Sequence, residues 1–155
     1  MDKDKKDTKD IEVSINLKSV AIPSGQEPDL MELITDGTLS RVEQEGRSGW
    51  KVVYSDGELT GFPDSSTEVT CFDNDYAQMN REGDFTQCIT MESGKRRSCE
   101  YTNEYGTLTL GVFAKDIINT LDHKGGELYL SYTLDANGTL VTENHVLLTV
   151  TPRDK

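Results

Sequence analysis

The amino-acid sequence predicts an all-β protein, a closed or nearly closed antiparallel up-and-down barrel of about eight to ten strands with at most one short helix. Apolar and polar residues alternate along most of the chain, which is the period of strands that bury one face. Turn sequences rich in glycine, asparagine and aspartate separate these segments. Strands joined in sequence leave two sheet edges, and closure into a barrel removes both.

The first strand is predicted to begin at Ile11. Its apolar residues occupy every second position, at Ile11, Val13, Ile15 and Leu17. The apolar positions then continue at Val20 and Ile22 with the opposite parity, which predicts a one-residue bulge near Ser19. A second strand spans about 29–43 and contains Gly37, and a glycine inside a strand pattern indicates a bulge or a sharp bend.

The middle of the chain predicts short strands and a hairpin. The strands cover 50–54, 67–72 and 76–81. In the hairpin that follows, a two-residue loop would place Cys88 opposite Cys99. A three-residue loop with Gly94 in the left-handed conformation places Phe85 opposite Tyr101. We favour the second register because it keeps apolar residues opposite apolar residues.

The last third of the chain predicts three further strands. Apolar alternation marks strands over 108–114 and 128–134. The segment 115–123 between them fits either one helical turn or a bent continuation of the strand. Asn137-Gly138 is a strong hairpin signal, because a type I′ turn needs positive φ at both central positions. The final strand runs over 139–151.

The charge composition argues against some classes of binding partner. Of 155 residues, 28 are acidic and 16 are lysine or arginine, so the formal net charge is −12. This charge repels phosphate backbones and anionic lipid, which argues against nucleic-acid and membrane partners. No window approaches the length of apolar sequence needed for a transmembrane helix. We therefore expect one soluble domain over 11–151, after a disordered charged leader at 1–10 and before a polar tail at 152–155.

The cysteines indicate a cytoplasmic protein. Cys71, Cys88 and Cys99 are odd in number and lack C-x-x-C spacing, so they do not suggest a disulfide framework. The N-terminus also lacks the apolar region of a secretory signal. We expect all three to be thiols within strands.

Several motifs are distributed over the chain: Ile15-x-Leu17, Thr35-x-Gly37, Trp50-x-Val52-x-Tyr54-x-Asp56-x-Glu58-x-Thr60-Gly61, Met79-x-Arg81-x-Gly83, Tyr101-x-x-x-Tyr105-Gly106-x-Leu108-x-Leu110 and Leu128-x-Leu130-x-Tyr132-x-Leu134. In these motifs, which cover about 11–151, the chain resembles the YwiB-like family, small bacterial β-barrel proteins of unknown function grouped with the calycins (lipocalin-like barrels). The motifs are mostly packing and turn positions, so the resemblance implies a calycin-like barrel and no particular activity.

A barrel of this size can enclose a small apolar or amphipathic molecule. The residues that combine an apolar body with a hydrogen-bonding tip are the candidates for lining a pocket: Trp50, Tyr54, Arg81, Tyr101 and Tyr105. The alternative is that they fill the barrel as core. Arg81, between Met79 and Gly83, is expected to face inward, where it forms either an ion pair with Glu58 or Glu100 or a site for an anion. Glu58 is therefore included among the candidate site residues.

Signals for catalysis are weak. His123 and His145 have no metal-ligand spacing to a cysteine or carboxylate, and no nucleophile elbow or glycine-rich phosphate loop is present. We therefore predict no catalytic residue, no metal and no cofactor, and we favour a protein that is not an enzyme.

Three functions remain in order of preference. The first is non-enzymatic binding of a small molecule in the barrel. The second is a structural or interaction module with a solid barrel, including a homodimer through an open sheet edge. The third is an enzyme built from carboxylates that converge at one barrel mouth. The sequence does not identify a ligand or an oligomeric state.

Overall fold

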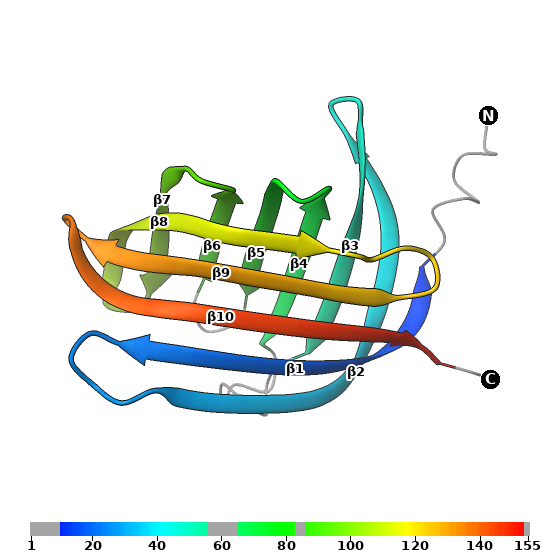
Figure 1. Cartoon of the computed structure of the whole chain (residues 1–155), viewed down its shortest axis with the longest axis horizontal. Helices are drawn as coiled ribbons and strands as arrows, with labels where there is room; N and C mark the ends of the chain where they lie inside the picture. The colour runs from blue at the N-terminus through cyan, green and yellow to red at the C-terminus, as the bar shows by residue number, and fades with distance from the viewer. Residues whose placement is uncertain (1–9, 56–64, 83–85, 154–155) are drawn as a thin grey trace.

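The chain folds into a closed barrel of ten antiparallel strands (Figure 1). The computed structural model describes residues 10–55, 65–82 and 86–153. The strands are β1 (Ile11–Pro23), β2 (Asp29–Gln44), β3 (Arg47–Ser55), β4 (Ser66–Phe72), β5 (Tyr76–Glu82), β6 (Thr86–Glu92), β7 (Arg96–Asn103), β8 (Gly106–Asn119), β9 (Gly126–Ala136) and β10 (Thr139–Pro152). No helix occurs among these residues, and the predicted fold class is confirmed.

Each strand pairs with its neighbour in the sequence, and β10 returns to pair with β1. The β1–β10 pairing runs without interruption from Val13 opposite Pro152 to Pro23 opposite Thr142. The first and last strands thus close the ring, and the interstrand hydrogen bonds leave neither strand at a sheet edge. The predicted leader falls almost entirely on residues 1–9, which lie outside the described part of the chain.

Two strands form the corners of the barrel. β2 pairs with β1 over Asp29–Leu39 and with β3 over Gly37–Gln44, so its two halves belong to different sides. β8 likewise passes from β7 to β9, with a register shift between Ala114 and Asp116. Figure 1 shows the result: β9, β10 and β1 run across the front, and β3 to β6 are steeply inclined behind them. Of the two alternatives for 115–123, the bent strand describes the segment through Asn119.

One predicted irregularity is wrong, and for the other the structure decides between the two alternatives. The bulge near Ser19 is absent, since the pairing of β1 with both neighbours continues through this residue without a register shift. Gly37 also pairs in continuous register, opposite Tyr54 and Val13, so it marks a bend and not a bulge. A β-carbon at Gly37 would overlap the carbonyl oxygen of Val53, so the close approach of backbones at this corner requires glycine.

The favoured hairpin register is wrong by two residues. β6 and β7 pair with Gln87 opposite Tyr101 and Cys88 opposite Glu100. Phe85 lies outside the described residues. Gly94 has the positive φ expected of it, at 77°, and its amide donates to the carbonyl of Ala114 on β8. The turn therefore contacts β8. Pairing apolar residues across a hairpin takes no account of such a tertiary contact.

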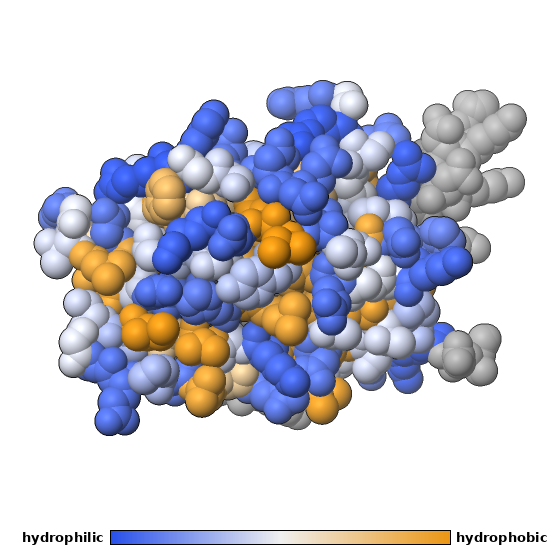
Figure 2. Space-filling model, in the orientation of Figure 1, coloured by the Kyte–Doolittle hydropathy of each residue, from blue (hydrophilic) through white to orange (hydrophobic). Residues whose placement is uncertain are grey.

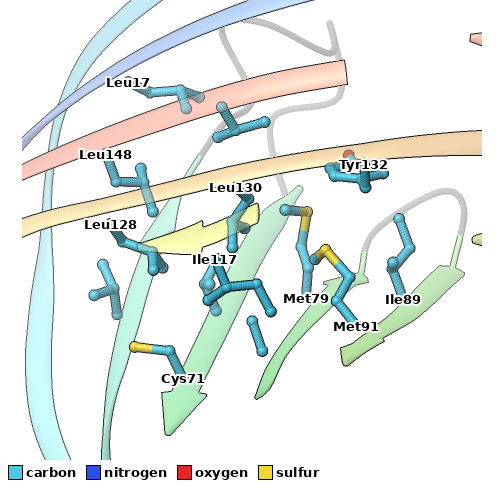
Figure 3. Close-up of a cluster of buried hydrophobic side chains, with 14 of the residues drawn as sticks. Leu17, Cys71, Met79, Ile89, Met91, Ile117, Leu128, Leu130, Tyr132 and Leu148 are labelled. Carbon is cyan, nitrogen blue, oxygen red and sulfur yellow. The ribbon is translucent and has the colours of Figure 1, made fainter. Parts of the chain in front are cut away.

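Inward-facing residues of all ten strands form one core (Figure 3). The largest fully buried side chains include Ile15, Leu39, Met91, Leu128, Leu130 and Leu148. Within the described ranges, no helix is long and apolar enough to cross a membrane.

Substituting Gly49 by alanine should destabilise the barrel. Gly49 is buried in β3, and a β-carbon there would overlap the carbonyl oxygen of Cys71 and the ring of Phe72. We expect Gly49→Ala to lower the free energy of unfolding by about 1–3 kcal/mol, because strand β4 must move to admit the methyl group. Urea denaturation measures the change. Ser98→Ala, at an exposed position of β7, is the matched control, and equal stability of both variants would contradict the close approach.

The three thiols should differ in reactivity. Burial raises the pKa of Cys71 to about 12, and burial together with the nearby Cys88 raises the pKa of Cys99. Both therefore remain protonated and inaccessible near pH 8, whereas Cys88 is exposed. We expect an aromatic disulfide reagent to modify one thiol per native chain, and Cys88→Ser to abolish this reaction. Rapid modification of Cys71 before unfolding would show that the core is open.

Candidate ligand-binding cavity

A cavity of about 210 Å³ lies inside the barrel, toward the end at which β1 leads into β2. Its apolar lining includes Leu17, Met79, Ile89, Leu134 and Val146. Polar side chains from several strands complete the lining, and they are Ser19, Tyr54, Arg81, Gln87, Tyr132 and Asn144. The arrangement is that of a small amphipathic pocket, with an apolar body and convergent hydrogen-bonding groups.

The polar wall follows from strand register. Tyr54 lies opposite Thr67, Thr67 opposite Arg81, and Arg81 opposite Gln87. Residues directly opposite each other in an antiparallel pair point to the same side of the sheet. Strands β3 to β6 therefore present one inward row of polar side chains, which continues to Tyr101 on β7.

Arg81 and Tyr132 give the cavity its electrostatic character. Arg81 is half-buried and its Nε atom is shielded from solvent. Burial raises the pKa of the Tyr132 phenol above its ordinary value, and the positive charge of Arg81 opposes part of that rise. Tyr132 is therefore a protonated phenol at neutral pH, able to donate a hydrogen bond within the cavity. Figure 3 shows Tyr132 above Met79 and Ile89.

Met31 lines the cavity from β2 and is 41% exposed although its parity is inward. A methionine can change rotamer at low cost and adapt its shape to different contacts. The described residues that line the cavity include no carboxylate. The hypothesis of an enzyme built from carboxylates at a barrel mouth therefore finds no acidic side chain in the described lining of this cavity.

Two of the predicted site residues, Tyr54 and Arg81, line the cavity. Tyr101 shares their inward row but lies beyond Gln87 and does not line it. Glu58 lies outside the described residues. Glu100, the other proposed partner of Arg81, is exposed and opposite Cys88, so it points to the outer side of the sheet.

Trp50 and Tyr105 do not line this cavity. Trp50 packs against the core beside Cys71, four residues or about 13 Å along β3 from Tyr54. Tyr105 lies in the β7–β8 turn and is 88% exposed. Both were selected for their side-chain chemistry, but their positions in the strand pattern place them elsewhere.

Sequence reasoning missed four polar residues of the site, Ser19, Gln87, Tyr132 and Asn144. A signal for them existed in the alternation. Tyr132 shares its parity with the buried Leu130, and Asn144 shares its parity with Val146. A polar residue at an inward position of a strand is the pattern that would have identified them.

A second polar network lies on the outside of the barrel. The Tyr129 hydroxyl is 2.8 Å from His145 Nδ1, and His145 Nε2 is 2.9 Å from Glu143 Oε2. Lys115 Nζ is 3.8 Å from the same carboxylate oxygen. The network joins β8, β9 and β10 on the outer face, so it does not reach the cavity. Nowhere in the described ranges do three or more His, Cys, Asp or Glu side chains cluster as for a metal ion.

Comparisons with known proteins agree with this architecture. The crystal structure of the ywiB protein from Bacillus subtilis matches with a TM-score of 0.76 at 16% sequence identity, covering 98% of this chain and 99% of that chain. This likeness shows a shared fold. No curated protein matches the sequence. The family model described as Domain of unknown function (DUF1934) matches residues 15–148, from β1 to β10. The chain therefore belongs to this family of YwiB-like barrels, whose function is unknown.

Proposed function

We propose that this protein binds a small amphipathic molecule in the interior cavity and performs no chemistry on it. One observation carries the proposal: a hollow of about 210 Å³ is lined by apolar side chains and by polar side chains from three strands, Tyr54, Arg81 and Tyr132. A barrel packed only for stability would fill this space with apolar side chains, because voids reduce stability.

The cavity volume limits the size of the molecule. An apolar cavity of about 150 Å³ in another protein holds benzene. A hollow of about 210 Å³ therefore suits one ring, or a short alkyl chain, with a single polar substituent. Drug-sized molecules need about 300–1,000 Å³ and do not fit.

The polar lining favours a hydrogen-bond acceptor on that molecule. Arg81 and Tyr132 both donate, and the amides of Gln87 and Asn144 can donate or accept. A carbonyl or carboxylate group toward Arg81 can accept hydrogen bonds from these donors, while the hydrocarbon part contacts Leu17, Met79 and Val146. The donors from opposite sides of the barrel would hold the polar group in one orientation.

The wider setting supports the same proposal. Eight-stranded barrels such as the lipocalins can hold one small ligand in their interior, and the barrel of this protein has ten strands. The three free cysteines fit a cytoplasmic protein.

Methyl NMR of methionine tests the proposal. Met31 and Met79 line the cavity, whereas Met91 is buried in the core and does not line it. We expect titration with benzoate, phenylacetate or benzamide to shift the Met31 and Met79 methyl signals and to leave Met91 nearly unchanged. Absence of any shift throughout this panel, or equal shifts of all three signals, would contradict binding at this place.

Two substitutions separate specific binding from general effects. Tyr132→Phe removes one donor, and we expect it to weaken the affinity for the best probe about 2–10-fold, the equivalent of one net hydrogen bond. Ala21→Phe places a ring in the cavity and should abolish the shifts. Ser98→Phe, at an exposed position on β7, is its matched control and should bind as the unmodified protein does.

A further inference from the structure

The described lining of the interior cavity carries charge of one sign. Among the described residues that line it, Arg81 is the one charged side chain, and none is a carboxylate. The chain as a whole is strongly acidic, with a formal net charge of −12. The charge in this lining is therefore opposite in sign to the net charge of the protein. A cation in the wall of a small cavity favours a negatively charged group beside it.

The positive charge of Arg81 acts across the cavity. Arg81 lies on β5 and Tyr132 on β9, four strands apart in the barrel, and both side chains line the cavity. Burial raises the pKa of the Tyr132 phenol, and the charge of Arg81 lowers it in part, so the two groups are close enough to interact. A polar group placed between them therefore meets a positive charge on one side and a phenol proton on the other.

A carboxylate matches these donors better than a neutral carbonyl does. A guanidinium presents its N–H donors in a planar fork, which fits the two oxygens of a carboxylate. Because it has five such donors, it can bind a partner within the protein and a ligand at the same time. Hydrogen bonds in which both groups are ionised are about twice as strong as neutral ones. Gln87, directly opposite Arg81, adds an amide that can donate to the same group.

We propose that the interior cavity selects small monocarboxylates, with Arg81 binding the carboxylate and the apolar lining contacting a single ring or a short alkyl chain. This inference rests on the proposed function and adds to it the charge of the ligand. The volume of about 210 Å³ sets the size of the molecule, and hydrogen bonding alone does not distinguish an amide from an acid. The cation in the wall makes that distinction.

A second hollow on the outside of the barrel provides a comparison. It measures about 430 Å³ and lies beside Tyr129 and Leu147, on the side where Figure 2 shows hydrophobic residues gathered between polar ones. Its lining contains both Lys18 and Glu32, so it does not present charge of a single sign. Met79 lines the interior cavity and not the outer hollow. The Met79 methyl signal therefore reports on the interior cavity directly.

Titration with three ligands of similar shape tests the selection. Benzoate, benzamide and benzylamine share one ring and are negative, neutral and positive at pH 7. From the Met79 methyl shift we expect a dissociation constant about 10-fold lower for benzoate than for benzamide, and no shift with benzylamine. Equal affinities for benzoate and benzamide would overturn the selection and leave the proposed function standing. No shift with either ligand would overturn both.

Substitution of Arg81 tests its role. Arg81→Gln removes the charge and keeps an amide, and we expect the preference for benzoate over benzamide to fall from about 10-fold to about one. Arg81→Lys keeps the charge without the planar fork and should retain part of the preference. The ratio of two affinities within one variant cancels general effects on the barrel.

Arg41→Gln is the matched control for the loss of charge. Arg41 is exposed, pairs with Glu43 and does not line the cavity. We expect this variant to keep the full preference for benzoate. A preference that survives Arg81→Gln, or one that is lost equally in Arg41→Gln, would overturn the assignment of Arg81.

Discussion

The double pairing of β1 is the constraint on which the rest of the structure depends. This strand is bonded to β2 on one side and to β10 on the other over nearly its whole length. The contact between β1 and β10 joins residues more than a hundred positions apart in the sequence, so forming it costs conformational entropy. The burial of Ile15, Leu17 and Leu148 offsets this cost. Without it the meander would expose two sheet edges, and the inward faces of ten strands would not enclose one core.

Closure also explains why the interior hollow lies where it does. Branched and long apolar side chains such as Leu128, Leu130 and Met91 fill the middle of the barrel (Figure 3). Toward the end at which β1 leads into β2, the inward positions pass to Ser19, Ala21, Thr67 and Gln87, which are shorter or polar. These residues leave space, and the polar ones also require hydrogen-bond partners. The same hollow can thus be described as a binding cavity or as an incompletely packed part of the core. The hydrogen-bond donors of Arg81 and Tyr132, which converge on it, favour a binding cavity.

The sequence predicted the fold, but only two of its candidate site residues line the cavity, and the reason is physical. Alternation reports which side of a strand a residue occupies, and Tyr54 and Arg81 both lie on the inward side. It does not report how far along the barrel a residue lies, so Trp50 fits the same pattern although it is about 13 Å from Tyr54 along β3. The apolar Val20 and Ile22 predict a bulge only if the outer face of the strand is polar. Both instead point outward in continuous register, and an apolar side chain on the outer face has no local signal in the sequence.

The strand pair β1–β2 lines two hollows on opposite sides of one sheet layer. One is the interior cavity, and the other is an outer hollow of about 430 Å³ between Val20, Leu30, Tyr129 and Leu147. Because successive residues of a strand point to opposite sides, Ser19 and Met31 face the interior while Val20 and Leu30 face outward. Both hollows have Ser19, Val20 and Met31 in their linings, so a substitution at one of these positions alters both at once. Tyr132 lines only the interior cavity, and a substitution there therefore reports on the interior alone.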